Sequence, residues 1–231
     1  MELKMKKLKY YFLSCNNPRR VEHMNNEFAE YNMTEVNPVS VDTGISKEQS
    51  GATGFCKMLD IAIKNQDKNK AFQPFVLFED DIKKYRKFPE KLDVPVNCDI
   101  LYIGLSSWGM TDDALGSNGT ICYSSVENYP DFVKIHNMLS THGFIITSII
   151  GLLALQKCLF EDFYRNRGYD MALAHIQPHI NAYALRKPLV YQYQPIGGQE
   201  VATKFEVPSG LERHIPPNWI NVTNLSYKTM F

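Results

Sequence analysis

The chain has 231 residues, of which 44% are hydrophobic and 12% aromatic, and this composition excludes a disordered polypeptide and favours one folded domain. Its 25 basic and 25 acidic side chains balance, so no global field attracts nucleic acid or a membrane surface, and we expect no nucleic-acid partner. The five cysteines are widely spread without a C-x-x-C pair, which is typical of free thiols in a reducing compartment.

No segment of the sequence has the pattern of a leader or a membrane span. The lysines near the amino terminus precede an apolar run that is shorter than the core of a signal peptide. The longest apolar segment, residues 143–155, is too short to cross a bilayer. We therefore expect a cytoplasmic protein with no transmembrane segment.

Apolar runs alternate with amphipathic stretches along the chain, which predicts an α/β fold: a mixed, mostly parallel central sheet flanked by helices. The predicted strands are residues 8–14, 35–41, 75–78, 99–105, 144–147 and 189–194. The predicted helices are residues 19–31, 53–65, 149–163 and 170–185, with Pro178 expected to kink or end the last one. Residues 106–117 read as a loop. Because no linker is visible, we expect a single domain over 1–231, with a core of about 8–195 and a loop-rich tail over 196–231.

Three consecutive carboxylates, Glu79, Asp80 and Asp81, follow the apolar strand 75–78. Like charges repel and resist leaving water, so folding alone gives no reason to gather them there. Oxygen ligands of this kind hold Mn²⁺ or Mg²⁺ and leave coordination positions for phosphates. We favour Glu79 with Asp81 as the metal ligands, because alternate residues of a strand share a face, with Asp80 and Asp81 as the other pairing. The alternative is an ordinary strand exit, with the acids capping a helix or facing solvent.

Polar side chains also follow the first two predicted strands. Asn16, Arg19 and Arg20 come after the first strand and Asp42 after the second. Ligands of open α/β sheets bind outside the carboxyl ends of the strands, so these residues are candidates for nucleotide binding, with the arginines facing phosphates. The alternative for each arginine is a solvated first helical turn.

Several segments, taken in order, resemble glycosyltransferase family 25, which includes lipopolysaccharide and collagen galactosyltransferases. The matching segments are YYFLSCNNPRRVEHM, GATGFCKMLDIAIK, FVLFEDD, THGFIITSIIGLLAL, YDMALAHI and INAYALRKPLVYQ. The chain departs from the family pattern at Phe55, which is inserted between Gly54 and Cys56, and at Thr147-Ser148, which replaces a Ser-Lys type pair.

This resemblance implies a GT-A fold, a UDP-sugar donor, a glycan or glycoprotein acceptor and a divalent metal, usually Mn²⁺. It adds Asp80 and His142 to the donor-binding candidates. It also places Asp170 on the acceptor side as the catalytic base of an inverting transfer, although a helix amino-terminal cap or a first-turn carboxylate is an equal interpretation of that residue. Two other functions stay open: a non-catalytic nucleotide-sugar-binding homologue, and a metal-dependent phosphotransferase or hydrolase that uses the carboxylates directly.

Overall fold

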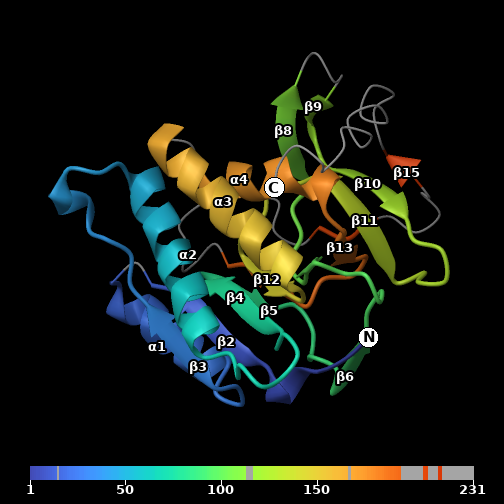
Figure 1. Ribbon diagram of the computed structural model, residues 1–231, viewed down its shortest axis with the longest axis horizontal. Coiled ribbons are helices and arrows are strands. Elements are labelled where there is room, and N and C mark those ends of the chain that lie inside the picture. Colours follow the sequence, from blue (N-terminus) through green and yellow to red (C-terminus); the bar gives the residue numbers. More distant parts are fainter. Residues whose placement is uncertain (15, 113–116, 166–167, 194–204, 208–212, 215–231) are drawn as a thin grey trace.

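The computed structural model describes residues 1–14, 16–112, 117–165, 168–193, 205–207 and 213–214. Its centre is a nine-stranded sheet in the order β15-β10-β11-β13-β7-β12-β4-β2-β3 (Figure 1). These strands are β2 (Lys9–Leu13), β3 (Met33–Val36), β4 (Phe75–Glu79), β7 (Ile100–Tyr102), β10 (Cys122–Ser125), β11 (Phe132–Asn137), β12 (Gly143–Ile146), β13 (Ala182–Leu185) and β15 (Arg213–His214).

The pairings give the direction of each strand in this sheet. Six of the nine strands, β3, β2, β4, β7, β13 and β10, run one way, and β12, β11 and β15 run the other way. The predicted mixed, mostly parallel sheet is thus confirmed. The antiparallel strand β12 lies between β4 and β7, so β12 begins at the end of the sheet where those two strands finish.

Helices and three small sheets complete the fold. The helices are α1 (Pro18–Glu27), α2 (Lys47–Lys64), α3 (Ile149–Arg165) and α4 (Tyr169–Ile176), and the 3₁₀ turns are Met5–Lys7, Val41–Thr43 and Gln177–His179. The small sheets pair β1 (Glu2–Lys4) with β6 (Lys91–Asp93), β5 (Ile82–Lys84) with β14 (Val190–Gln192), and β8 (Trp108–Asp112) with β9 (Ser117–Thr120).

Each face of the central sheet is covered by its own apolar core, because successive strand side chains point to opposite faces. Tyr11 and Leu13 of β2 pack with α2, α3 and α4 on one face. Tyr10 and Phe12 of the same strand pack against α1 on the other face. The α2–α3–α4 layer stands in front of the sheet in Figure 1.

Local sequence explains where the first two helices begin. Pro18 at the first helical position suits the start of α1, where Asn17 caps the helix by accepting a hydrogen bond from the Arg19 amide. Ser46 and Gln49 form a reciprocal capping box that starts α2 six residues before the predicted helix 53–65.

One predicted strand, one predicted loop and one predicted helix need correction. The strand predicted over 35–41 ends at Val36, just before the segment that contains Pro38, so Asp42 lies in a 3₁₀ turn and not at a strand end. The region predicted as the loop 106–117 contains β8 and begins β9, a short hairpin. The predicted helix 170–185 stops at Ile176, and its last four residues form β13, because Ala182–Leu185 pairs in parallel with β7.

The strand predicted over 189–194 forms as β14, but it lies outside the central sheet. It pairs with β5, the short strand that follows the carboxylates. The predicted tail 196–231 lies outside the described residues apart from residues 205–207 and 213–214.

Candidate functional site

Glu79 is the last residue of β4, and two hydroxyl groups hold its carboxyl group. Its Oε1 atom accepts hydrogen bonds from the Thr141 hydroxyl at 2.8 Å and the Tyr169 hydroxyl at 3.0 Å. Burial, followed by the charge of Asp81, raises the pKa of Glu79 to about 8, against the opposing effect of these two donors. At neutral pH this carboxyl group is therefore mostly protonated, unless a cation lies beside it.

Asp80 points toward α1, where it is almost completely buried and paired with an arginine. Its Oδ1 atom lies 2.7 Å from Nη1 of Arg20. The predicted phosphate-facing Arg20 thus binds a carboxylate of its own chain. This pair joins the first turn of α1 to the end of β4. It therefore fixes the positions of these two segments relative to each other, and the predicted donor site would lie beside both.

Asp81 lies in the turn that follows β4, so the alternation of a strand does not extend to it. Its Oδ2 atom accepts a hydrogen bond from Nε2 of Gln192 at 3.1 Å and lies 4.0 Å from Nη2 of Arg20. Its Oδ1 atom is buried and has no hydrogen-bond partner among the residues that the structure describes. A buried carboxylate oxygen without a partner is costly, which marks a place where a cation would fit.

Asp170 lies in the first turn of α4 and is close enough to the strand end for its charge to raise the pKa of Glu79. Burial raises the pKa of Asp170 itself, while the backbone amide of Met171, which donates to its Oδ1 at 2.9 Å, acts against that rise. The residue in the cap position of this helix is Gly168. Asp170 is thus a first-turn carboxylate near the site, as one of the two alternative interpretations has it, and does not occupy the cap position.

His142 immediately precedes β12 and is 6% exposed. Its Nε2 atom lies 3.1 Å from the carbonyl oxygen of Leu105, and the ring packs against Gly104, where an added Cβ would lie 2.4 Å from Cδ2. Burial lowers the pKa of His142 to about 4, so the ring is neutral at physiological pH. The structure places this candidate at the start of β12, where its ring has protein partners that follow β7.

The remaining predicted donor-binding residues are exposed. Asn16 lies three residues beyond Leu13, the last residue of β2, and has a left-handed backbone, with φ of 56°. Arg19 is exposed on the first turn of α1, and Asp42 accepts a hydrogen bond from the Ser40 hydroxyl at 2.9 Å within its 3₁₀ turn. The hydrogen bonds and ion pairs described for these three residues do not join any of them to the carboxylates.

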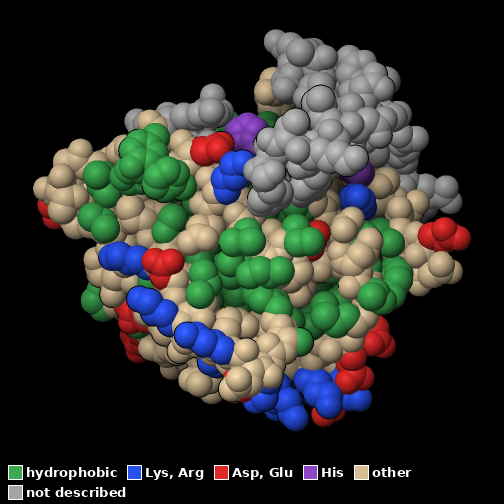
Figure 2. Space-filling model, in the orientation of Figure 1, with side chains coloured by type: hydrophobic (Ala, Val, Ile, Leu, Met, Phe, Trp, Pro, Cys, Tyr) green, Lys and Arg blue, Asp and Glu red, His purple; other side chains and the backbone are tan. Residues whose placement is uncertain are grey.

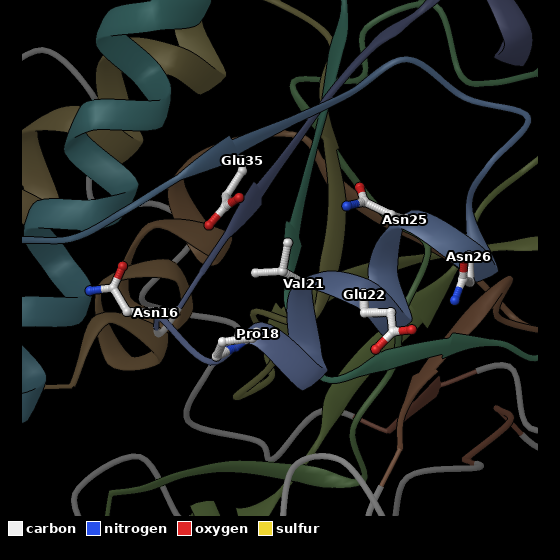
Figure 3. Close-up of a pocket in the computed structure, with 7 residues that line it drawn as sticks. All are labelled: Asn16, Pro18, Val21, Glu22, Asn25, Asn26 and Glu35. Atoms are coloured by element: carbon white, nitrogen blue, oxygen red, sulfur yellow. The ribbon is translucent and has the colours of Figure 1, made fainter.

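Asn16 also lines a hollow of about 530 Å³ between α1 and the edge strand β3 (Figure 3). Its lining residues are Asn16, Pro18, Val21, Glu22, Asn25, Asn26 and Glu35. Most of these side chains come from α1, and Asn16 is the one predicted donor-binding residue among them. The hollow is therefore distinct from the group of carboxylates.

Three side chains that contact the carboxylates were not predicted: Thr141, Tyr169 and Gln192. All three lie in segments whose resemblance to family 25 is noted above. Their hydroxyl and amide groups carry no charge, so they gave no separate signal in the sequence. They reach the carboxylates through the direction of β12, the start of α4 and the pairing of β14 with β5.

The carboxylates fit a metal site in which the protein supplies only some of the ligands and a bound substrate supplies others. No cluster of three or more His, Cys, Asp or Glu side chains in the described ranges is arranged as a metal site. Mg²⁺ and similar ions are commonly bound by one or two carboxylates together with phosphate oxygens and water. The partnerless oxygen of Asp81 and the neighbouring Glu79 supply such a pair.

No family model and no curated protein matches the sequence. Among solved structures, the fold is similar to CTP:phosphocholine cytidylyltransferase from Streptococcus pneumoniae, with a TM-score of 0.42 and 8% identity over 82% of this chain and 75% of that one. A similarity this distant carries no function from that enzyme to this chain.

Proposed function

We propose that the chain is a metal-dependent glycosyltransferase of family 25, with a GT-A fold, that transfers a sugar from a UDP-sugar to a hydroxyl group of a glycan or glycoprotein. The observation that carries the proposal is the group of carboxylates at the end of β4, above all the buried Asp81 oxygen that lacks a partner. The order of motifs that resembles the family supports it. So does the convergence of three segments: the carboxylates after β4, the first turn of α1 after β2, and Thr141 before β12. These three strands are neighbours in the central sheet.

Mn²⁺ or Mg²⁺, when bound, would neutralise the charge that develops on the UDP leaving group. Asp81 and Glu79 are the residues that would hold it. Thr141 and Tyr169 fix the orientation of Glu79 by donating to the same oxygen. Gln192 orients Asp81 in the same way, because its Nε2 atom donates to Oδ2 of Asp81 and not to the partnerless Oδ1.

Asp170 takes the role of general base in this proposal. The acceptor oxygen attacks the anomeric carbon of the sugar, the bond from that carbon to the UDP oxygen breaks, and the hydroxyl proton passes to the Asp170 carboxylate. A base works best when its pKa approaches the working pH, and burial shifts the pKa of Asp170 in that direction.

Calorimetric titration of the full chain with UDP, GDP and CDP, each with and without Mn²⁺, tests the donor class and the metal together. We expect UDP to bind most tightly and only in the presence of Mn²⁺. In Asp81→Asn, this Mn²⁺-dependent affinity should fall by about a hundredfold or more, because one charge and one ligand oxygen are lost. Release of UDP from UDP-sugars then separates a catalyst from a protein that only binds.

Asp93→Asn is the matched control, since Asp93 is an exposed acid at the end of β6. It should bind UDP as the parent does. Equal UDP affinity with and without Mn²⁺, or parent-like binding by Asp81→Asn, would refute the metal role.

A further inference from the structure

A second hollow, of about 400 Å³, lies at the end of the central sheet opposite the carboxylates. It is bounded by the start of β2, the residues that follow α2, and the segment that leads into β4. Because β2 and β4 are parallel and the carboxylates come at the end of β4, the length of these strands separates the hollow from the candidate site. Its volume is in the range of small-molecule sites, roughly 300–1,000 Å³.

Three aromatic residues that contact one another line this hollow: Tyr11, Phe72 and Phe75. The ring centroid of Phe75 lies 6.0 Å from that of Tyr11 and 6.1 Å from that of Phe72. Tyr11 and Phe75 are buried in the core, whereas Phe72 is only partly buried and stays accessible. A planar aromatic molecule would extend this cluster, because aromatic rings at such distances attract each other beyond the effect of the area that they bury.

Hydrogen bonds fix the walls of the hollow in place. The Gln66 side chain accepts from the backbone amide of Gln73 at 2.8 Å and donates to the carbonyl oxygen of the same residue at 3.0 Å. These two bonds join the segment that carries Phe72 to the residues after α2. The Asn65 side chain donates to the Tyr11 hydroxyl at 3.2 Å. The hollow is thus formed before a ligand enters it, which lowers the entropic cost of binding.

Three lysines line the hollow, and none of its described lining residues is acidic. Lys9 donates to the backbone carbonyl oxygen of Asn65 at 3.0 Å, a neutral partner that leaves the charge of the lysine uncompensated. Lys70 is paired with Asp67 at 2.9 Å, and the ion pairs among the described residues do not involve Lys7. Three lysines against one aspartate leave a surplus of two positive charges. Figure 2 shows basic side chains along the lower part of α2 and at the lower edge of the molecule.

We propose that this hollow binds a small aromatic anion, that is, a planar ring that carries a phosphate, sulfonate or carboxylate group. The ring would lie against Phe72, and Lys7 and Lys9 would bind the anionic group. An inorganic anion would leave the aromatic side chains without a partner, and a neutral aromatic molecule would leave the lysine charges uncompensated. The proposal does not depend on the transferase activity, since the hollow shares no lining residue with the group of carboxylates.

Calorimetric titration of the full chain with three probes tests the proposal. Naphthyl phosphate carries both the ring and the anion, naphthol lacks the anion, and inorganic phosphate lacks the ring. EDTA is present throughout, so that no divalent cation can bring a phosphate to the carboxylates. We expect naphthyl phosphate to bind at least about tenfold more tightly than either of the other two probes.

Two variants remove one half of the predicted recognition each. Lys7→Gln with Lys9→Gln should weaken the binding of naphthyl phosphate about tenfold, because two positive charges are lost. Phe72→Leu should weaken it about fivefold, because leucine keeps the wall apolar but lacks the ring. Thermal melting checks that each variant is folded.

Exposed residues elsewhere provide matched controls. Lys87→Gln removes an exposed charge between β5 and β6, and Phe160→Leu removes an aromatic ring that is 61% exposed on α3. The second control is needed because α3 carries further exposed hydrophobic side chains, on which an aromatic probe could settle. No helix in the described part of the chain, α3 included, is long and apolar enough to cross a membrane. Both control variants should bind naphthyl phosphate as the parent does.

The proposal is overturned if the parent does not bind naphthyl phosphate, or if naphthol or inorganic phosphate binds as tightly. Parent-like binding by the double lysine variant or by Phe72→Leu would overturn it as well. A loss of binding in Phe160→Leu would place the probe on α3 and have the same consequence. None of these outcomes bears on the Mn²⁺-dependent binding of UDP, which is measured separately.

Discussion

Glu79 is a carboxyl group that its surroundings favour in the protonated form, and this links the stability of the protein to pH. Its ordinary pKa is 4.5, and burial raises the folded value to about 8. Between these two values the folded chain binds more protons at this residue than the unfolded chain does. The contribution of Glu79 to stability is therefore complete below the lower value and is lost as the pH rises through the upper one.

We expect the free energy of unfolding, measured without divalent cations, to fall between pH 5 and 8 with a contribution from Glu79 of up to about 1.4 kcal/mol per pH unit. Glu79→Gln should flatten this slope, because its amide oxygen still accepts from Thr141 and Tyr169 but does not titrate. Urea denaturation at several pH values measures the free energy of unfolding and so gives the slope. Glu90→Gln, at an exposed position, should keep the parental slope. An unchanged slope in Glu79→Gln would show that the carboxyl group is already ionised.

Asp170 offers a test that separates a base from a structural residue. Asp170→Asn should lower sugar transfer by roughly a hundredfold or more while leaving UDP affinity nearly unchanged, because a base acts on the acceptor proton. Burial disfavours the charged carboxylate, so the neutral amide should leave the melting temperature nearly unchanged or raise it slightly. Retained transfer would remove Asp170 from the mechanism, and a large fall in melting temperature would assign it a structural role.

At the level of residues, charge was the signal that the sequence offered. The carboxylates stood out because three adjacent charges after an apolar strand need a reason. Thr141 and Tyr169 did not stand out, since hydroxyl side chains are common throughout protein sequences. Their role depends on β12 lying beside β4 and on where α4 begins. The pairing of Arg20 with Asp80 was also invisible, because the two residues are 60 positions apart.

Among the elements, α2 shows how closely a helix approaches the site. A Cβ added at Gly51 would lie 2.1 Å from Cε1 of Tyr169, the residue whose hydroxyl donates to Glu79. Gly51 therefore leaves room for the ring, and a side chain at this position must displace it.

Gly51→Ala should destabilise the protein by about 1–3 kcal/mol, through overpacking against the Tyr169 ring. In a Tyr169→Ala background the clash is absent. The same substitution should then be neutral or stabilising, since alanine favours a helix over glycine by up to about 1 kcal/mol. Chemical denaturation of the parent, the two single variants and the double variant gives the coupling free energy between residues 51 and 169. Equal effects in both backgrounds would mean that α2 shifts and the ring does not.

The elements that the sequence predicted well are those with one consistent pattern. The apolar strand before the carboxylates and the helix 149–163 match β4 and α3 closely. The alanines and leucine of Ala182–Leu185 favour a helix, whereas parallel pairing with β7 makes this segment a strand. The pattern of Glu35 to Val41 predicts a continuous strand, although Pro38 removes a backbone donor within it.

At the scale of the whole molecule, both apolar cores share the strands of one sheet. Tyr10 belongs to one core and Tyr11 to the other, although they are neighbours in β2. Neither core can lose its strands while the other keeps them. We therefore expect a single cooperative unfolding transition from the described core.

Differential scanning calorimetry measures this directly, as the agreement between calorimetric and van't Hoff enthalpies. Phe28→Ala, in the core beneath α1, and Phe55→Ala, in the core beneath α2, should each cost about 3–5 kcal/mol. Each should move the same transition to lower temperature. Two resolved transitions, one shifted by each variant, would divide the chain into two units.

The reversed direction of β12 bears on the order in which the chain folds. Because β12 begins where β4 ends, Glu79 contacts Thr141, which is 62 positions away in the sequence. The start of α4 brings Tyr169, which is 90 positions away, to the same oxygen. Contacts between such distant segments form slowly, since a long loop must close before they bring any gain. During synthesis on the ribosome, the carboxylates are made well before the hydroxyl groups that orient them. A nascent chain that has not yet emerged beyond residue 169 should therefore possess the acidic strand end but not the competence to bind its ligand.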